Sequence, residues 1–220
     1  MPDSSTLHVN LWKKRLRLVP KSVWESADLE TLVLADNHLM EVPERIGTLK
    51  KLRLLDLGHN RLTQVPAALG GLDGLTDFLY LHDNRLTSLP SSLERLTNLR
   101  YLNISDNAFE HLPECVTAMT GLLELRVSGN RLTSVPESLG GLSRLRELHL
   151  RGNRLATLPA SIGKLQELRQ IDLRGNPLTQ LPAAIAALPR LDKLDLRWVP
   201  SFALPEWVAA LEDRGCLVYR

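Results

Sequence analysis

The sequence has little net charge, no long apolar run and only two cysteines. Its 27 Lys and Arg against 25 Asp and Glu leave a formal net charge of +2. That balance gives neither a nucleic-acid footprint nor a basic membrane-binding patch. No stretch approaches the roughly 20 apolar residues that a membrane span needs. Residues 1–14 also lack an apolar run of signal-peptide length. We therefore expect no nucleic-acid partner and no membrane partner.

The dominant feature of the sequence is one repeated unit. It begins with a leucine, recurs after 23 residues, and takes 24 residues once, between Leu75 and Leu99. The units begin at Leu29, Leu52, Leu75, Leu99, Leu122, Leu145, Leu168 and Leu191. An asparagine recurs in step from Asn37 to Asn176, and a Leu-Pro or Val-Pro pair recurs from Pro20 to Pro205. Self-similarity at a fixed period of this length predicts a solenoid. Each unit is too small to bury its own apolar face, so it stacks on its neighbours.

The pattern L-x-x-L-x-L-x-x-N-x-L-x-x-L-P resembles the leucine-rich repeat over nearly the whole chain. The 23-residue length and the Leu-Pro pair resemble the intracellular class, which includes Ras-group and bacterial-type repeat proteins. The resemblance implies an α/β solenoid, a right-handed horseshoe with a parallel β-sheet on its concave face. That concave face would carry the ligand surface, and the convex side would be irregular or 3₁₀.

Elementary geometry predicts the same architecture. In L-x-L the two leucines point to one side of a short strand and the middle residue to the other. The asparagine ends the strand, where its amide can pair with turn backbone groups of its own and the neighbouring unit. The proline fixes φ and removes a donor, which suits an irregular return path.

We predict one solenoid over residues 1–220, in three parts. Residues 1–28 form an N-terminal cap and a worn first repeat, in which Trp24 fills a gap in the core. Residues 29–190 form seven regular repeats, and residues 191–220 form the last repeat and a C-terminal cap. Nine short parallel strands are expected, with a bulge where the extra residue lies, among residues 76–78. Residues 205–215 predict a capping helix, and residues 216–219 a closing edge strand.

The two cysteines, Cys115 and Cys216, lie about four repeats apart. With strands about 4.8 Å apart, that separation forbids a disulfide bridge. Secreted leucine-rich repeat proteins usually carry cysteine-rich caps, and this chain has none. We therefore expect a reducing, cytoplasmic location, which includes the inside of a host cell if the protein is a delivered effector.

Side chains between and beside the strand leucines form columns along the concave face. We predict partner-binding residues of two kinds in these columns, apolar or aromatic ones grouped on neighbouring strands and basic ones further along. They are Leu54, Phe78, Tyr80, His82, Tyr101, Arg126, His149, Arg151, Arg174 and Arg197. The aromatic residues could instead be ordinary cross-strand pairs. The arginines could instead pair with Glu124, Glu147, Asp172 and Asp195 on a solvated face.

Catalytic and metal-binding interpretations are weaker. His82, Asp83 and Ser105 superficially suggest a nucleophile with its base, but an open sheet has no pocket and no oxyanion donors. The column Asp36, His59, Asp83 and Asp106 could ligate a cation. Such residues beside turns more often hydrogen-bond their own loops. We predict no catalytic, cofactor-binding or metal-binding residue, and no cofactor.

Three functional hypotheses remain from the sequence. The leading one is a non-enzymatic, monomeric module that binds a partner protein on its concave sheet. The alternative is the substrate-recognition domain of a larger enzyme, as in bacterial effectors that join leucine-rich repeats to a ubiquitin ligase. A third is a structural solenoid without a partner.

Overall fold

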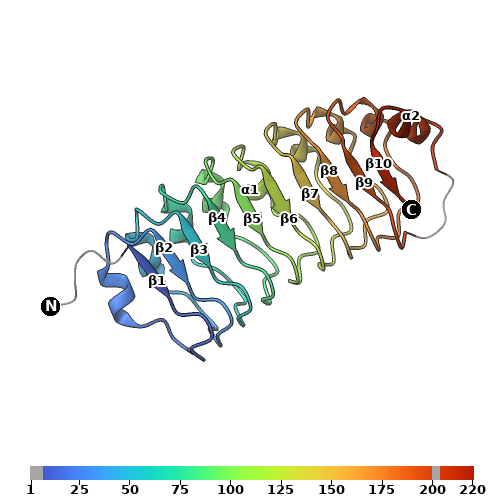
Figure 1. Ribbon diagram of the computed structural model, residues 1–220. Coiled ribbons are helices and arrows are strands. Elements are labelled where there is room, and N and C mark those ends of the chain that lie inside the picture. The colour runs from blue at the N-terminus through green and yellow to red at the C-terminus, as the bar shows by residue number, and fades with distance from the viewer. Residues whose placement is uncertain (1–6, 200–203) are drawn as a thin grey trace.

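The computed structural model describes residues 7–199 and 204–220, and places ten short parallel strands in one open, curved sheet (Figure 1). The strands follow each other in sequence order, and each pairs with the next in register. They are β1 (His8–Asn10), β2 (Thr31–Val33), β3 (Leu54–Asp56), β4 (Phe78–Tyr80), β5 (Tyr101–Asn103), β6 (Glu124–Arg126), β7 (Glu147–His149), β8 (Gln170–Asp172), β9 (Lys193–Asp195) and β10 (Leu217–Tyr219). The predicted solenoid is confirmed, with the nine expected strands and the closing edge strand β10.

The other side of the solenoid is built from short 3₁₀ segments, each beginning directly after a proline of the Leu-Pro or Val-Pro column. They are η1 (Lys21–Glu25), η2 (Glu44–Thr48), η3 (Ala67–Gly71), η4 (Ser91–Arg95), η5 (Glu137–Gly141), η6 (Ala160–Lys164) and η7 (Ala183–Ala187). The unit at Pro113 differs, because it forms one α-helical turn, α1 (Glu114–Thr117). The prediction of a 3₁₀ or irregular convex side is therefore confirmed in all units but that one.

The core lies between the sheet and the 3₁₀ segments. The middle residue of each inner strand, such as Leu32, Leu102 or Ile171, has no exposed surface. Phe109 replaces the usual leucine after the asparagine and is also fully buried. Since every unit contributes to one continuous cluster, each unit is stabilised by the apolar surface that it shares with its neighbours.

The asparagine column supplies the hydrogen bonds that the turns lack. Asn107 Nδ2 donates to the carbonyl oxygens of Leu81, Ile104 and Ser105 at 3.0, 3.2 and 3.0 Å, and its Oδ1 accepts from the Leu86 amide at 2.9 Å. The asparagines of the neighbouring units repeat this arrangement. Each therefore joins its own unit to the preceding one and satisfies backbone groups that would otherwise be buried unpaired.

The inserted residue produces a local bulge at the start of β4, as predicted. In other units, the two amides leading into a strand donate to a single carbonyl of the preceding unit. Here the Arg100 amide donates to Thr76 and the Tyr101 amide to Asp77, so two residues occupy the place of one. The strand register beyond the bulge is unchanged, so the side chains of β4 still face the same way as those of β3 and β5.

The two ends are closed differently. Trp24 packs into the core of the first unit, as expected. At the other end, α2 (Trp207–Asp213) buries Val208 and Leu211, and Gly215 follows at a φ of +89°. The capping helix is thus shorter than the predicted range 205–215. Ser201, which replaces a repeat leucine in the last unit, lies outside the described residues.

Candidate functional site

The strand register brings the predicted partner-binding residues onto the outward face of the sheet, here called the open face. Leu54, Phe78 and Tyr101 are direct cross-strand neighbours on β3, β4 and β5. Arg126 and His149 are likewise neighbours on β6 and β7. Tyr80 lies on β4, two residues after Phe78. The remaining residues, His82, Arg151, Arg174 and Arg197, follow two positions after the ends of their strands.

Phe78, Tyr80 and Tyr101, together with Leu54, form what we call the aromatic cluster. The Phe78 and Tyr80 rings are stacked with centroids 5.9 Å apart, and Tyr101 lies 5.5 Å from Phe78 and 5.0 Å from Tyr80. Phe78 remains 39% exposed. Burial raises the pKa of the Tyr80 phenol, and it raises that of Tyr101 to about 12. The cluster is therefore an ordered, half-buried apolar surface beside solvent.

A histidine pair continues this cluster toward the ends of the strands. The His82 ring lies 6.0 Å from Tyr80 and 4.7 Å from His59, whose Nδ1 is 2.5 Å from Asp83 Oδ2. Gly58 makes this possible, because a Cβ there would lie 2.3 Å from the His82 ring. Burial, with the neighbouring His59, lowers the pKa of His82 and so favours its neutral imidazole. Its Nδ1 is buried without a hydrogen-bond partner among the described residues.

Arg151, Arg174 and Arg197 form what we call the arginine ladder. Arg174 donates to Asp172 through Nε at 2.8 Å and Nη2 at 2.5 Å. Arg197 makes the same bidentate pair with Asp195, at 3.0 and 2.7 Å. The ion-pair interpretation therefore describes these two arginines. Arg151 is exposed and has no carboxylate partner in the described parts of the chain.

The aspartates under the ladder are buried, although they belong to an outward-facing column. Asp172 is 3% and Asp195 1% exposed, because the arginines lie over them. Burial alone would raise the pKa of Asp195. The hydrogen bonds from the Arg197 side chain and amide, and the charge of Arg174, outweigh it and hold the pKa below its ordinary value. Asp195 is thus a charged anchor at neutral pH.

Trp198 adjoins the ladder and was not among the predicted binding residues. Its ring centroid lies 5.2 Å from the guanidinium carbon of Arg151, 5.8 Å from that of Arg174 and 5.9 Å from that of Arg197. The side chain is 66% exposed, and its backbone has a φ of +60°. That left-handed conformation costs about 1–3 kcal/mol in a residue with a side chain.

The left-handed conformation recurs in every unit at this position. The residues with it are Lys13, Asp36, His59, Asp83, Asp106, Gly129, Gly152, Gly175 and Trp198. Asp36, His59, Asp83 and Asp106, considered above as cation ligands, therefore sit on turns, where Asp36 pairs with Lys13 and Asp83 with His59. The turn interpretation accounts for this column.

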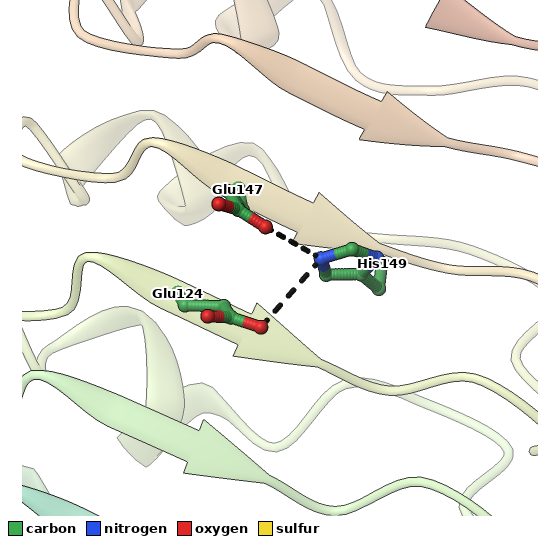
Figure 2. A group of neighbouring side chains, drawn as sticks. All are labelled: Glu124, Glu147 and His149. Carbon is green, nitrogen blue, oxygen red and sulfur yellow. Dashed lines mark hydrogen bonds and ion pairs between the residues drawn. The ribbon is translucent and has the colours of Figure 1, made fainter. Parts of the chain in front are cut away.

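A different group, Glu124, Glu147 and His149, brings possible metal ligands together (Figure 2). His149 Nε2 is 3.1 Å from Glu147 Oε2 and 3.7 Å from Glu124 Oε1. However, Arg126 Nε already contacts Glu124 Oε1 at 2.5 Å. The two glutamates are direct cross-strand neighbours, and like charges so placed repel. Arg126 offsets that repulsion, and His149 Nε2 lies within hydrogen-bond distance of Glu147, so the contacts within the group account for it without a metal ion.

The arrangement of His82 and Ser105 does not support a catalytic pair. Ser105 is 7% exposed, and its Oγ accepts a hydrogen bond from the Ser128 amide at 3.1 Å. Within the described residues, no hydrogen bond joins it to His82. The arrangement lacks the contact by which a base activates a nucleophile.

The family of the chain follows from the repeated unit and from comparison with known proteins. The leucine rich repeat family matches residues 27–86, 77–132, 113–155 and 143–198, so that it covers most of the sequence. The chain belongs to the leucine-rich repeat family. Among curated proteins, none matches the sequence.

Solved leucine-rich repeat structures superimpose on most of this chain. A leucine-rich repeat protein of Leptospira interrogans is 26% identical, with a TM-score of 0.75 over 94% of this chain and 64% of its own. The ectodomain of the Arabidopsis thaliana receptor kinase GASSHO1/SCHENGEN3, in complex with CASPARIAN STRIP INTEGRITY FACTOR 2, is 32% identical, with a TM-score of 0.76 over 86% and 24%. The plant peptide hormone receptor RGFR1, in complex with RGF2, is 28% identical, with a TM-score of 0.76 over 92% and 36%. This leucine-rich repeat chain thus spans less than two thirds of each relative.

Sequence reasoning did not include Trp198 among the binding residues, although Trp198 belongs to the same column as Asp36, His59, Asp83 and Asp106. That position is glycine in the three preceding units. A tryptophan there must lie beside the ladder, since the turn geometry is the same.

The described residues contain no helix long and apolar enough to cross a membrane.

Proposed function

We propose that this protein is a non-enzymatic binding module that holds a partner protein on the open face of its sheet. The observation that carries the proposal is the aromatic cluster. Three rings in mutual contact, with Leu54 as the cross-strand neighbour of Phe78, gather on three neighbouring strands of a face that is otherwise mostly polar. Rigid aromatic side chains of this kind supply much of the binding energy at protein interfaces.

The surroundings of the cluster support the same role. A hollow of about 370 Å³ lies beside Phe78 and Tyr101 and is lined by Arg53, Arg100 and Glu124, among others. Arg126, His149 and the arginine ladder continue the surface toward the C-terminal end, where they would orient an acidic part of the partner. Two structural relatives were solved with a peptide hormone or integrity factor bound. The fold is therefore compatible with such a ligand.

We further propose that the chain acts as one monomeric solenoid of the intracellular, 23-residue class, in the cytoplasm. Both cysteines are free and buried, which suits a reducing compartment. Burial raises the pKa of Cys115 to about 11 and also raises that of Cys216, so neither thiol is reactive at neutral pH. Nucleic acid and membrane are not proposed as partners.

The test is capture of the partner by the wild-type protein and by two matched double variants. Tyr80→Ala with Tyr101→Ala should lose about 2 kcal/mol or more per ring, which abolishes capture. Thr31→Ala with Val33→Ala changes the same two columns on β2, two strands from Tyr80 and three from Tyr101, and should bind normally. Melting curves of both variants should stay close to wild type. If the tyrosine variant retains a genuine partner, the open face is not the binding surface.

The recognition domain of a larger enzyme is the alternative, and it would use the same surface. The two hypotheses differ only in whether a catalytic domain is joined to these repeats. The mass of the native protein, isolated from its source, separates them.

A further inference from the structure

Trp198 occupies a position that its backbone conformation disfavours. The corresponding residues of the three preceding units are Gly129, Gly152 and Gly175, which adopt the left-handed conformation without strain. Burial of the ring does not explain its presence, because two thirds of Trp198 is exposed. Strained residues of this kind persist where the surroundings hold them, often at ligand-binding sites.

The space around the Trp198 ring is shaped by the glycine column. Cβ atoms built on Gly152 and Gly175 would meet only the backbone of the preceding glycine, at 3.7 and 3.9 Å. Gly129, Gly152 and Gly175 therefore leave a strip of surface without side chains beside the arginine ladder, and the Trp198 ring lies at its C-terminal end. The ring contacts all three guanidinium groups at cation–π distance.

Two of these guanidinium groups are held in fixed orientations. Arg174 and Arg197 each use Nε and Nη2 to bind a nearly fully buried aspartate. A guanidinium carries five N–H donors, and no hydrogen bond within the described residues uses Nη1 of either arginine. Arg151 donates to no carboxylate there. The ladder thus offers donors that are already oriented, which lowers the cost of binding an oxyanion.

We propose that Arg151, Arg174, Arg197 and Trp198 form an oxyanion-binding subsite that takes a carboxylate-rich segment of the partner protein. This inference rests on the proposed function of the open face. Carboxylates accept from the free guanidinium edges, and the Trp198 ring packs against the segment between them. A hollow of about 340 Å³ extends from Arg151 and Arg174 to His82, whose ring lies 6.0 Å from that of Tyr80 in the aromatic cluster.

The charge of the ladder favours a carboxylate-rich peptide over a polyphosphate chain. Three arginines lie among two buried aspartates, so the excess is one positive charge. A nucleic-acid strand brings a phosphate about every 3.4 Å, and the interleaved aspartates would repel so dense a charge. Acidic side chains on an extended peptide, which alternate between its two faces, can be placed to avoid them.

The test is the affinity of a fluorescein-labelled hexaglutamate peptide, measured by fluorescence polarisation at low salt. The wild-type protein should bind it, and a Gly-Ser peptide of equal length should not bind. Arg151→Gln and Trp198→Gly should each weaken hexaglutamate binding about tenfold. Trp198→Gly should melt at the same or a higher temperature, because glycine relieves the strain. The matched control is Trp12→Ala, which removes another exposed tryptophan that contacts a lysine and should leave binding unchanged.

Several results would overturn the subsite. These are no binding of hexaglutamate by the wild type, unaltered binding by Trp198→Gly, or a lower melting temperature of that variant, which would make the ring a structural brace. Tighter binding of a polyphosphate of equal charge would overturn the assignment to carboxylates. The Tyr80→Ala, Tyr101→Ala variant should bind hexaglutamate normally. If that variant loses the partner while the wild type fails to bind hexaglutamate, the proposed function stands and only the subsite fails.

Discussion

The aromatic cluster and the arginine ladder lie on the same face of one sheet, yet they are built in opposite ways. In the cluster, rings lie directly on the strands and shield one another from solvent. In the ladder, long cationic side chains lie over aspartates and bury them, so that Asp195 is 1% exposed. Asp56, in the same column at β3, has no arginine over it among the described residues. The comparison shows that equal backbone positions acquire unequal burial from neighbouring side chains.

Truncation of a buried core side chain should lower the free energy of unfolding by a similar amount beneath the two regions. Leu102→Ala beneath the cluster and Ile171→Ala beneath the ladder each remove a fully buried side chain. Each should lower the free energy of unfolding by about 2–5 kcal/mol through the cavity left behind. Urea melts of both variants measure this. A large difference between them would mean that the two halves differ in the core as well as on the open face.

Replacement of a column asparagine by alanine should also lower the free energy of unfolding similarly in both regions, by less than the core truncations do. Asn107→Ala and Asn153→Ala each leave unpaired the backbone carbonyls and the one backbone amide that the wild-type side chain hydrogen-bonds. Each should cost about 1–3 kcal/mol in urea melts. A neutral result at either site would contradict the role of these amides in joining the units.

The aspartates of the two regions should respond differently. Asp195→Asn removes the charge under Arg174 and Arg197 and should cost about 1–2 kcal/mol at pH 6, since both arginines are partly solvated. Asp56→Asn should lower the free energy of unfolding by less than Asp195→Asn does at the same pH. Burial raises the pKa of Asp56, while hydrogen bonds from Arg197 hold that of Asp195 low despite its burial.

These opposite pKa shifts predict opposite pH dependences. The stability that Asp195 contributes is present above its unfolded pKa, about 4, and is lost as the pH falls through its folded pKa. The advantage of the wild type over Asp195→Asn should therefore shrink between pH 6 and pH 3. For Asp56, stability is lost as the pH rises through the raised pKa. The free energy of unfolding of the wild type should therefore increase relative to that of Asp56→Asn as the pH is lowered. Urea melts across this range measure both, and equal slopes would refute the contrast.

The smallest effect is expected for Asn103, which faces outward between the two regions. Its Oδ1 accepts the Ser105 amide at 3.0 Å, a local contact that water can replace. Asn103→Ala should cost about 0.5 kcal/mol, far less than the adjacent Leu102→Ala. If urea melts show the two variants to be equally damaging, the assignment of inward and outward faces at β5 is wrong.

Much of the fold could be predicted because each unit repeats one local rule. The alternation of Leu102 and Asn103, the asparagine after each strand and the proline after each return path all act within a few residues. The α-helical turn at Glu114–Thr117 was not predicted, and we have no physical account of why this unit differs. The predicted site residues lie on one face as expected, but their grouping into contacts depends on side-chain conformations that the repeat does not specify.

The sequence by itself determined the number of strands, their parallel order, the inward leucines and the column in which each outward residue lies. These follow because a fixed period and short-range sterics leave one way for the units to stack. Only the tertiary structure decided that Asp172 and Asp195 are buried, that Arg151 has no carboxylate partner within residues 7–199 and 204–220, and that the Trp198 ring lies against three arginines. The reason is that long side chains cross from one unit to the next, and their final positions depend on every neighbour at once.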